Sequence, residues 1–97
     1  MLTHIVCWKY KTETTREQKE THLAKLKNLP NVIPNINSFN IGFDVLHLER
    51  SFDLGLVAVY PDRTALDFYT VHPEHQAVAA IGKQIAERVV SVDFLSE

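Results

Sequence analysis

The sequence has little cysteine and no long apolar segment. Its 97 residues include one cysteine, Cys7, so no disulfide bond can form within the chain. This usage is typical of proteins in a reducing compartment, and we therefore expect a cytoplasmic protein. The apolar stretch at residues 1–6 is short and soon followed by charge, so we expect neither a signal peptide nor a membrane span.

Glycine is also scarce, and neither sign of charge dominates. The three glycines, Gly42, Gly55 and Gly82, lie far apart, which excludes a glycine-rich phosphate-binding loop. The formal net charge is −2, and the basic residues near the start of the chain are interleaved with glutamates, as on the solvent-facing side of a helix. The sequence therefore predicts no nucleic-acid partner.

The hydrophobic pattern predicts a single domain, residues 1–97, built from strands and helices. Apolar residues recur at every second position in some segments and at helical spacing in others. Thr15 and Gln18 match a capping box that opens the first helix, and Pro30 and Pro34 are expected to bracket a short turn after it. The expected strands are residues 2–10, 36–43, 54–60 and 89–94, the expected helices are residues 15–29, 62–71 and 73–88, and residues 44–53 form an irregular connection.

This β-α-β-β-α-β order is that of a ferredoxin-like α+β fold, an antiparallel four-stranded sheet with helices on one face. Three of the strands are apolar on both faces, yet the helices can cover only one face. The patch left uncovered would be larger than a soluble monomer normally exposes. We therefore expect a two-fold homodimer that packs sheet against sheet.

Residues 69–75 combine three side chains that exchange protons or hydrogen bonds with a central proline. The residue before a proline is pushed out of the helical region, so a helix should end here. Pro73 suits the first turn of a new helix, with His72 as its N-cap. Tyr69 then lies in the last turn of one helix and His75 in the first turn of the next, where both can face one cavity.

The Tyr69–His75 pair suits proton transfer next to a carbonyl group. The dipole at a helix N-terminus disfavours the cation of His75, and a neutral imidazole can accept a proton. Tyr69 can donate to the oxygen that gains charge, or relay the proton. A structural interpretation stays open, in which His75 binds a nearby carbonyl, Tyr69 fills the space between helix and sheet, and His72 is only a cap.

A metal site is the other chemistry that this segment suggests. His72 and His75 are three residues apart with Glu74 between them. A capping residue points differently from a residue inside the helix, and no further histidine or cysteine pair completes a set of three or four ligands. We therefore expect no metal, and Cys7, without a base near it in the sequence, is not expected to be a nucleophile.

With this order of elements the chain resembles the stress-responsive A/B-barrel domain family. The resemblance covers nearly the whole length and implies a ferredoxin-like monomer and a homodimer whose sheets form a dimeric α/β barrel. Many members of this family have no established activity. The supporting segments are His4-Ile5-Val6, Thr15-x-x-Gln18, Val32-Ile33-Pro34, Gly42 and Val92-Asp93, and the most specific is Tyr69-x-x-His72-Pro73-x-His75.

The resemblance also implies candidate site residues. One enzyme of the family, a plant polyketide cyclase, performs an aldol cyclisation with a tyrosine and a histidine that match Tyr69 and His75, our candidate catalytic residues. A further pocket histidine matches His4. Leu54 and Leu26 stand where that pocket has a histidine and a tyrosine, which argues against the same substrate and puts catalysis in question. The candidate substrate-binding residues are His4, Leu26, Leu54 and His72.

Two classes of function remain open. The chain is either a small homodimeric barrel protein that is structural or binds an apolar metabolite between sheet and helices, or a cofactor-free enzyme that acts on a carbonyl compound. The sequence contains no haem-ligand pattern, and we expect no cofactor. A cavity that touches His4, Tyr69 and His75 together would favour the enzyme, and an interior filled by side chains would favour the first class.

Overall fold

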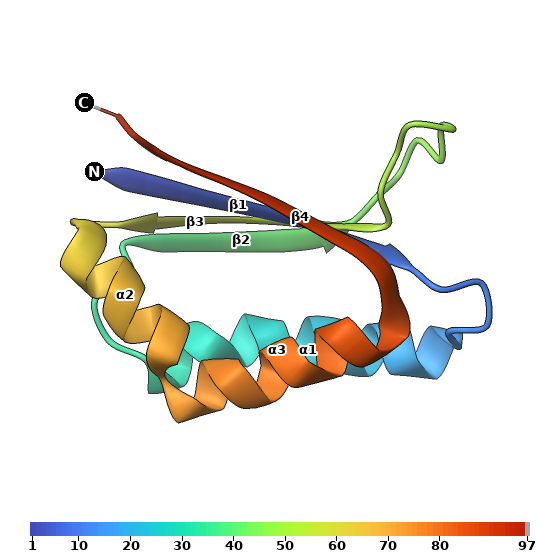
Figure 1. The fold of residues 1–97 in the computed structure, drawn as a ribbon, viewed down its shortest axis with the longest axis horizontal. Helices are drawn as coiled ribbons and strands as arrows, with labels where there is room; N and C mark the ends of the chain where they lie inside the picture. Colours follow the sequence, from blue (N-terminus) through green and yellow to red (C-terminus); the bar gives the residue numbers. More distant parts are fainter. Residues whose placement is uncertain (97) are drawn as a thin grey trace.

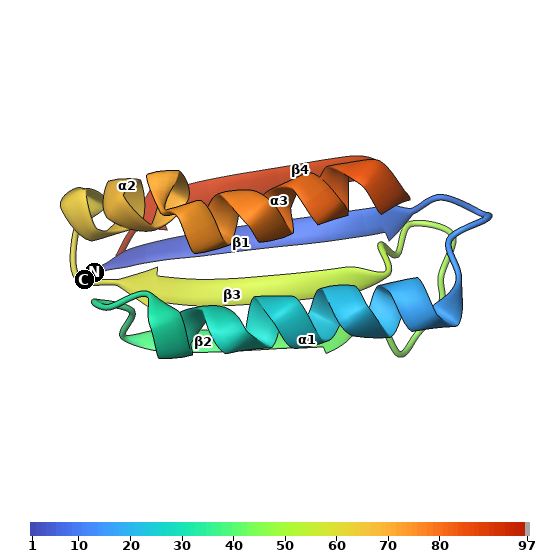
Figure 2. The same cartoon turned by 90° about the horizontal axis from the view of Figure 1, so that it is seen from below.

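An antiparallel sheet carries all of the helices on one face in the computed structural model, which describes residues 1–96 (Figure 1). The strand order is β2-β3-β1-β4, which confirms the predicted ferredoxin-like α+β fold. Seen from below, α1 lies on the β2–β3 side and α3 on the β1–β4 side (Figure 2). The strands are β1 (Leu2–Tyr10), β2 (Ser38–Phe43), β3 (Leu54–Tyr60) and β4 (Ala86–Leu95), and the helices are α1 (Arg16–Val32), α2 (Arg63–Val71) and α3 (Pro73–Ile85).

The central strand β1 determines which side chains face the helices. It pairs with β3 on one side and β4 on the other, so His4 lies opposite both Ala58 and Asp93. Side chains alternate between the two faces of a strand, and the even-numbered residues of β1 point toward the helices. Val6 and Trp8 on this inner face are buried.

The start of α1 follows the prediction, and its end does not. Thr15 accepts the N–H of Gln18 at 3.1 Å while its own N–H donates to the Gln18 side chain at 2.8 Å, which confirms the capping box. The predicted end near Leu29 is wrong, because α1 continues through Pro30. A proline inside a helix costs about 3 kcal/mol. The extra turn offsets this cost because it buries Ile33, whose N–H donates to the Leu29 carbonyl at 2.9 Å.

The corner between α2 and α3 is as predicted. His72 has the extended conformation expected before a proline (φ −62°, ψ 133°), and it caps both helices. Its Nδ1 accepts the N–H of Glu74 at 3.1 Å, and Pro73 occupies the first turn of α3. Tyr69 and His75 therefore lie on the two sides of one sharp corner.

The boundary between α3 and β4 differs from the prediction. The helix ends at Ile85, so Glu87 and Arg88 belong to β4 and not to α3. The carbonyl of Ile85 accepts the N–H of Lys11 at 2.9 Å and the hydroxyl of Thr14 at 2.7 Å, and these bonds from the segment after β1 end the helix early. The strand β2 also begins later than predicted, at residue 38 and not at residue 36.

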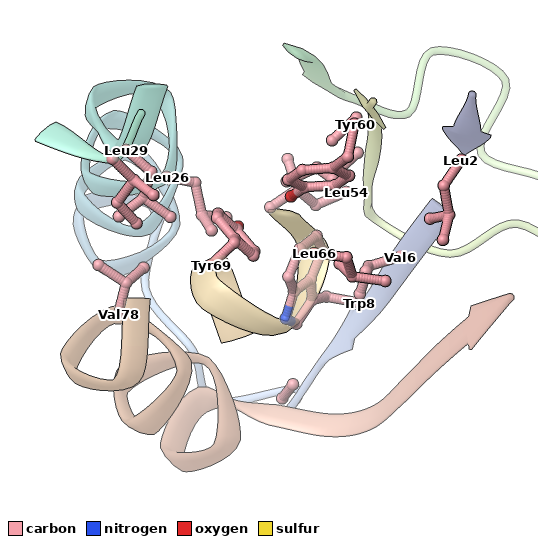
Figure 3. Packing of buried hydrophobic residues seen from close by; sticks show 14 of the residues in the cluster. Leu2, Val6, Trp8, Leu26, Leu29, Leu54, Tyr60, Leu66, Tyr69 and Val78 are labelled. Carbon is pink, nitrogen blue, oxygen red and sulfur yellow. The ribbon is translucent and has the colours of Figure 1, made fainter. Parts of the chain in front are cut away.

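The hydrophobic core fills the space between the sheet and the helices (Figure 3). Its buried side chains come from β1, β3 and all three helices, with a single residue from the start of β4. β2 contributes Phe39 and Ile41, which pack against the margin of the core and are only partly buried. The inner face of the sheet therefore supports both the core and the site described below.

The outer face of the sheet is apolar and uncovered. Val57 on β3 and Val90, Val92 and Phe94 on β4 are all exposed there. The connection at residues 44–53 rises beyond this same face (Figure 1), and its apolar side chains include two of the most exposed in the chain. As predicted, these strands are apolar on both faces.

Truncation of Leu29 should destabilise the protein strongly. This side chain is 2% exposed, and replacing a buried leucine by alanine leaves a cavity, so we expect Leu29→Ala to lower the free energy of unfolding by about 2–5 kcal/mol. Urea denaturation followed by circular dichroism measures the change. The exposed Lys25→Ala on the same helix is the control and should differ from the wild type by about 0.5 kcal/mol or less.

Candidate functional site

A cavity of about 240 Å³ lies between the inner face of the sheet and the helices. It exceeds the roughly 150 Å³ of a cavity that binds benzene and falls below the roughly 300–1,000 Å³ of pockets for drug-sized ligands. The volume therefore suits one substituted ring or a short chain. The lining residues are His4, Val6, Trp8, His22, Leu26, Leu56, Tyr69, Thr70, His75, Val78, Ala79, Lys83, Val89 and Ser91.

A larger hollow of about 600 Å³ lies outside α1, where the helix faces the 44–53 connection. Charged residues of both signs line it, among them Arg16, Glu20 and Asp53, and it touches none of the predicted site residues. The smaller cavity brings several of those residues together, and we place the candidate site there.

Four of the predicted site residues line the smaller cavity, and two do not. His4, Leu26, Tyr69 and His75 meet in its wall. Leu54 is buried in the core outside the cavity, and its neighbour Leu56 on the same face of β3 is part of the lining. His72 is the helix cap and packs edge-on against Phe68, away from the cavity.

His75 is held through one ring nitrogen. Its Nδ1 lies 2.9 Å from the carbonyl oxygen of Thr70, and because a carbonyl can only accept, Nδ1 carries the proton and Nε2 the lone pair. Burial lowers the pKa of His75, and the bond to Thr70 offsets only part of this effect. The ring is therefore neutral at pH 7 and can accept a proton at Nε2.

Tyr69 lies directly against His75. The two ring centroids are 4.4 Å apart, with an angle of 39° between the ring planes. Tyr69 is 2% exposed, and burial raises its pKa to about 12, so the hydroxyl keeps its proton at neutral pH. A proton acceptor and a proton donor thus lie side by side in the cavity wall.

His4 supplies a second oriented imidazole, from the sheet. Its Nδ1 donates to the carboxylate of Asp93, its partner in the β1–β4 register, which leaves Nε2 free of that bond. The His4 ring centroid is 6.3 Å from that of Tyr69. A carboxylate orients a catalytic histidine in the same way in many enzymes.

His22 and Tyr10 form a buried pair beside the cavity. The Tyr10 hydroxyl and Nδ1 of His22 share a hydrogen bond of 2.7 Å. The His22 ring packs edge-on against Trp8, and Gly82 allows this contact, since a β-carbon there would lie 3.0 Å from Nε2 of His22. His22 is fully buried, and burial lowers its pKa to about 4.

Sequence reasoning did not identify Asp93 and His22 as parts of this site. In the sequence Asp93 stands out only as part of a family motif, although a polar residue on the inner face of the last strand is a usable signal once His4 is placed on the first. His22 lies within the predicted first helix, and its pairing with Tyr10 depends on the tertiary fold, which sequence periodicity does not specify.

The arrangement can perform acid–base chemistry without added groups. A neutral imidazole and a protonated phenol in one mostly apolar cavity can remove a proton next to a carbonyl and stabilise the oxygen that gains charge. Within residues 1–96 no group of three or more histidine, cysteine or acidic side chains could hold a metal ion. In the same part of the chain no helix is long and apolar enough to cross a membrane.

Comparison with known families and curated proteins gives two matches. The model of the family described as the stress-responsive A/B barrel domain matches residues 2–96. Olivetolic acid cyclase of Cannabis sativa is 25% identical over 93 residues, which cover 94% of this chain and 92% of that protein.

Solved structures show the same fold. A dimeric ferredoxin-like protein of unknown function from Thermobifida fusca is 26% identical, with a TM-score of 0.89 over 98% of this chain and 90% of that one. The hydroxynitrile lyase of Passiflora edulis is 18% identical, with a TM-score of 0.88 over 99% and 93% of the two chains, and this likeness is one of fold alone. The resemblance predicted from the sequence is confirmed.

Acidification should destabilise the protein through His22. Its pKa of about 4 in the fold lies below the usual value of about 6.5 in an unfolded chain. The stabilisation is complete above pH 6.5 and is lost as the pH falls toward 4, because the unfolded chain then binds the proton more readily. We expect His22 to account for a loss of about 2 kcal/mol between pH 7.5 and pH 5.

Urea denaturation at these two pH values measures the effect. His22→Phe should lose most of the pH dependence of stability. A smaller part should remain, because the pKa of His75 is lowered as well. The control is His47→Asn, an exposed position with φ of 54° that asparagine tolerates. A pH dependence in His22→Phe equal to that of the wild type would contradict the assignment.

Proposed function

The chain belongs to the stress-responsive A/B barrel domain family, and from this premise we propose that its cavity binds a small carbonyl compound on which His75 and Tyr69 perform cofactor-free acid–base chemistry. The observation that carries the proposal is the contact of these two rings in the wall of one cavity, with Nδ1 of His75 occupied by the Thr70 carbonyl. That bond leaves Nε2 as the base.

The reaction class follows from the two groups. Nε2 of His75 takes a proton from the carbon next to the carbonyl, and the hydroxyl of Tyr69 donates to the carbonyl oxygen as charge develops on it. The carbanion equivalent formed in this way can attack a second carbonyl, which is the first half of an aldol-type ring closure. The relative named as a cyclase supports this class and does not specify the substrate.

His4 and Asp93 provide a second polar group from the sheet side. The bond to Asp93 holds the His4 ring in one orientation and assigns the free position to Nε2. In the proposed reaction this imidazole binds the second oxygen function of the substrate or returns the proton. The apolar side chains of Val6, Leu26 and Leu56 exclude water around these groups.

Simple binding without turnover is the second candidate. The remaining wall of the cavity is mostly apolar, which supports a carrier or sensor of a small apolar metabolite equally well. The two candidates differ in one respect, since only the enzyme needs the proton on Tyr69 and the lone pair on His75.

The protein is further proposed to act as a homodimer through the outer face of the sheet. Several solved relatives are described as dimeric, and in this chain the outer face exposes four large apolar side chains on β3 and β4. A second copy packed on this face would bury them, and the apolar 44–53 connection rises on the same side (Figure 1). The cavity lies on the opposite face, so each protomer would keep its own site.

Loss of the base should abolish proton abstraction. The probe is acetophenone in deuterium oxide, whose methyl protons exchange only if a base removes them, and proton NMR follows the loss of their signal. We expect His75→Ala to slow the exchange by about 100-fold or more and Tyr69→Phe by about 10- to 100-fold. His47→Asn, which changes an exposed histidine, should match the wild type.

A thermal-shift titration with the same compound separates the two candidates. Ligand at 100 times its Kd stabilises a protein by about 2.7 kcal/mol. Stabilisation of the wild type without any exchange would favour the binding protein. Equal exchange in the wild type and His75→Ala would contradict the assigned base.

A charge on the outer face should separate the protomers. Val92 is 54% exposed and lies on the outer face of β4 between Val90 and Phe94, so Val92→Lys would place an ammonium group in the proposed interface. We expect the wild type to show the mass of two chains by light scattering and Val92→Lys that of one. Val71→Lys, at a position 68% exposed on α2, is the control and should remain dimeric.

A further inference from the structure

Tyr60 carries a hydroxyl that the fold leaves without a partner. The residue ends β3, is fully buried, and its Oη forms no hydrogen bond within residues 1–96. Buried polar groups are nearly always paired, because an unpaired one loses its hydration without replacement. A phenylalanine would fill the same space without this cost, so the hydroxyl calls for a role beyond packing.

The surroundings of Tyr60 connect it to the proposed acid. Its ring centroid lies 5.4 Å from that of Tyr69 and 6.2 Å from that of His4. The hydroxyl oxygen of Tyr60 lies on the side of its ring that faces Tyr69 (Figure 3). Tyr60 is not part of the cavity lining, so any effect on a bound compound must pass through a neighbour.

We propose that Tyr60 is a positioning residue that donates its hydrogen bond to Tyr69 at the moment when Tyr69 gives up its proton. This inference rests on the proposed function. Nε2 of His75 takes the proton from the carbon, the electron pair of that C–H bond forms the C=C bond of an enol, and the carbonyl oxygen takes the hydroxyl proton of Tyr69. Tyr69 is left as a phenolate, which accepts the O–H of Tyr60, and the reverse transfers restore both residues.

The electrostatics of the pair agree with this role. Burial raises the pKa of Tyr69, which opposes proton release, whereas a hydrogen bond from the Tyr60 hydroxyl to the ionised Tyr69 lowers this pKa. Burial raises the pKa of Tyr60 itself, and the adjacent Tyr69 and Asp93 raise it further, so Tyr60 keeps its proton and remains a donor. A donor that is already in place when charge develops needs no rearrangement.

A double-mutant cycle on the acetophenone exchange tests whether Tyr60 acts through Tyr69. We expect Tyr60→Phe to lower kcat by about 10- to 100-fold with little change in KM, and to leave thermal stability equal or higher, because only an unpaired hydroxyl is lost. In the Tyr69→Phe background the same substitution should have no further effect. Equal losses in both backgrounds would overturn the proposal.

A titration of Tyr69 tests the same contact without any substrate. The chain has three tyrosines, so labelling with 3,5-difluorotyrosine, whose phenol is more acidic, gives few fluorine signals, and tyrosine-to-phenylalanine variants assign them. We expect the Tyr69 signal to titrate about one pH unit higher or more in Tyr60→Phe than in the wild type. An unchanged midpoint would overturn the proposal, whereas absent exchange with a shifted midpoint would count only against the proposed function.

Discussion

The carbonyl of Thr70 is the group on which the arrangement of the site depends. The end of a helix leaves its last carbonyls without helical partners, and this one accepts from Nδ1 of His75 at 2.9 Å and from the side-chain amide of Gln76 at 2.7 Å. These bonds hold the first turn of α3 against the last turn of α2. A continuous helix would satisfy the carbonyl internally and, six residues apart, would place Tyr69 and His75 on different sides. The break before Pro73 is therefore what brings the two rings together.

The three inward histidines share one design. In each, a ring nitrogen is engaged by a structural partner, which is the carbonyl of Thr70 for His75, the carboxylate of Asp93 for His4 and the phenol of Tyr10 for His22. This bond to Nδ1 fixes the ring in place, and Nε2 takes no part in it. All three rings line the cavity, but Nε2 of His22 is buried and is packed against Gly82. The same chemistry thus gives two candidate reacting groups and one group that mainly couples stability to pH.

Most of the fold could be predicted because its signals are local. The capping box at Thr15 and the helix break at Pro73 depend on a few neighbouring residues, and both were correct. The errors arose where distant segments decide the outcome. The burial of Ile33 carries α1 past Pro30, and the bonds of Lys11 and Thr14 to Ile85 end α3 early.

The same distinction applies to the site. Tyr69 and His75 were predictable together because they flank one corner, whereas Asp93 and Tyr60 come from β4 and β3, which reach the site only once both have paired with β1. The resemblance pointed to Leu54, but the cavity lies further along the same face of β3, so Leu56 and not Leu54 is part of the lining. Whether a cavity stays open depends on how all of these side chains pack, and no local pattern encodes that.

The pairing of β1 with β4 has a consequence for the order in which the molecule forms. His4 and Asp93 are 89 positions apart, and the backbone of Met1 exchanges hydrogen bonds with that of Ser96, so this edge of the sheet closes nearly the whole chain into one loop. Closing so long a loop is entropically costly and belongs to the slow steps of folding. During synthesis one edge of β1 remains without its partner strand until β4 has left the ribosome. The carboxylate that orients His4 therefore arrives after the rest of the site, and no nascent chain that lacks β4 can possess the complete site.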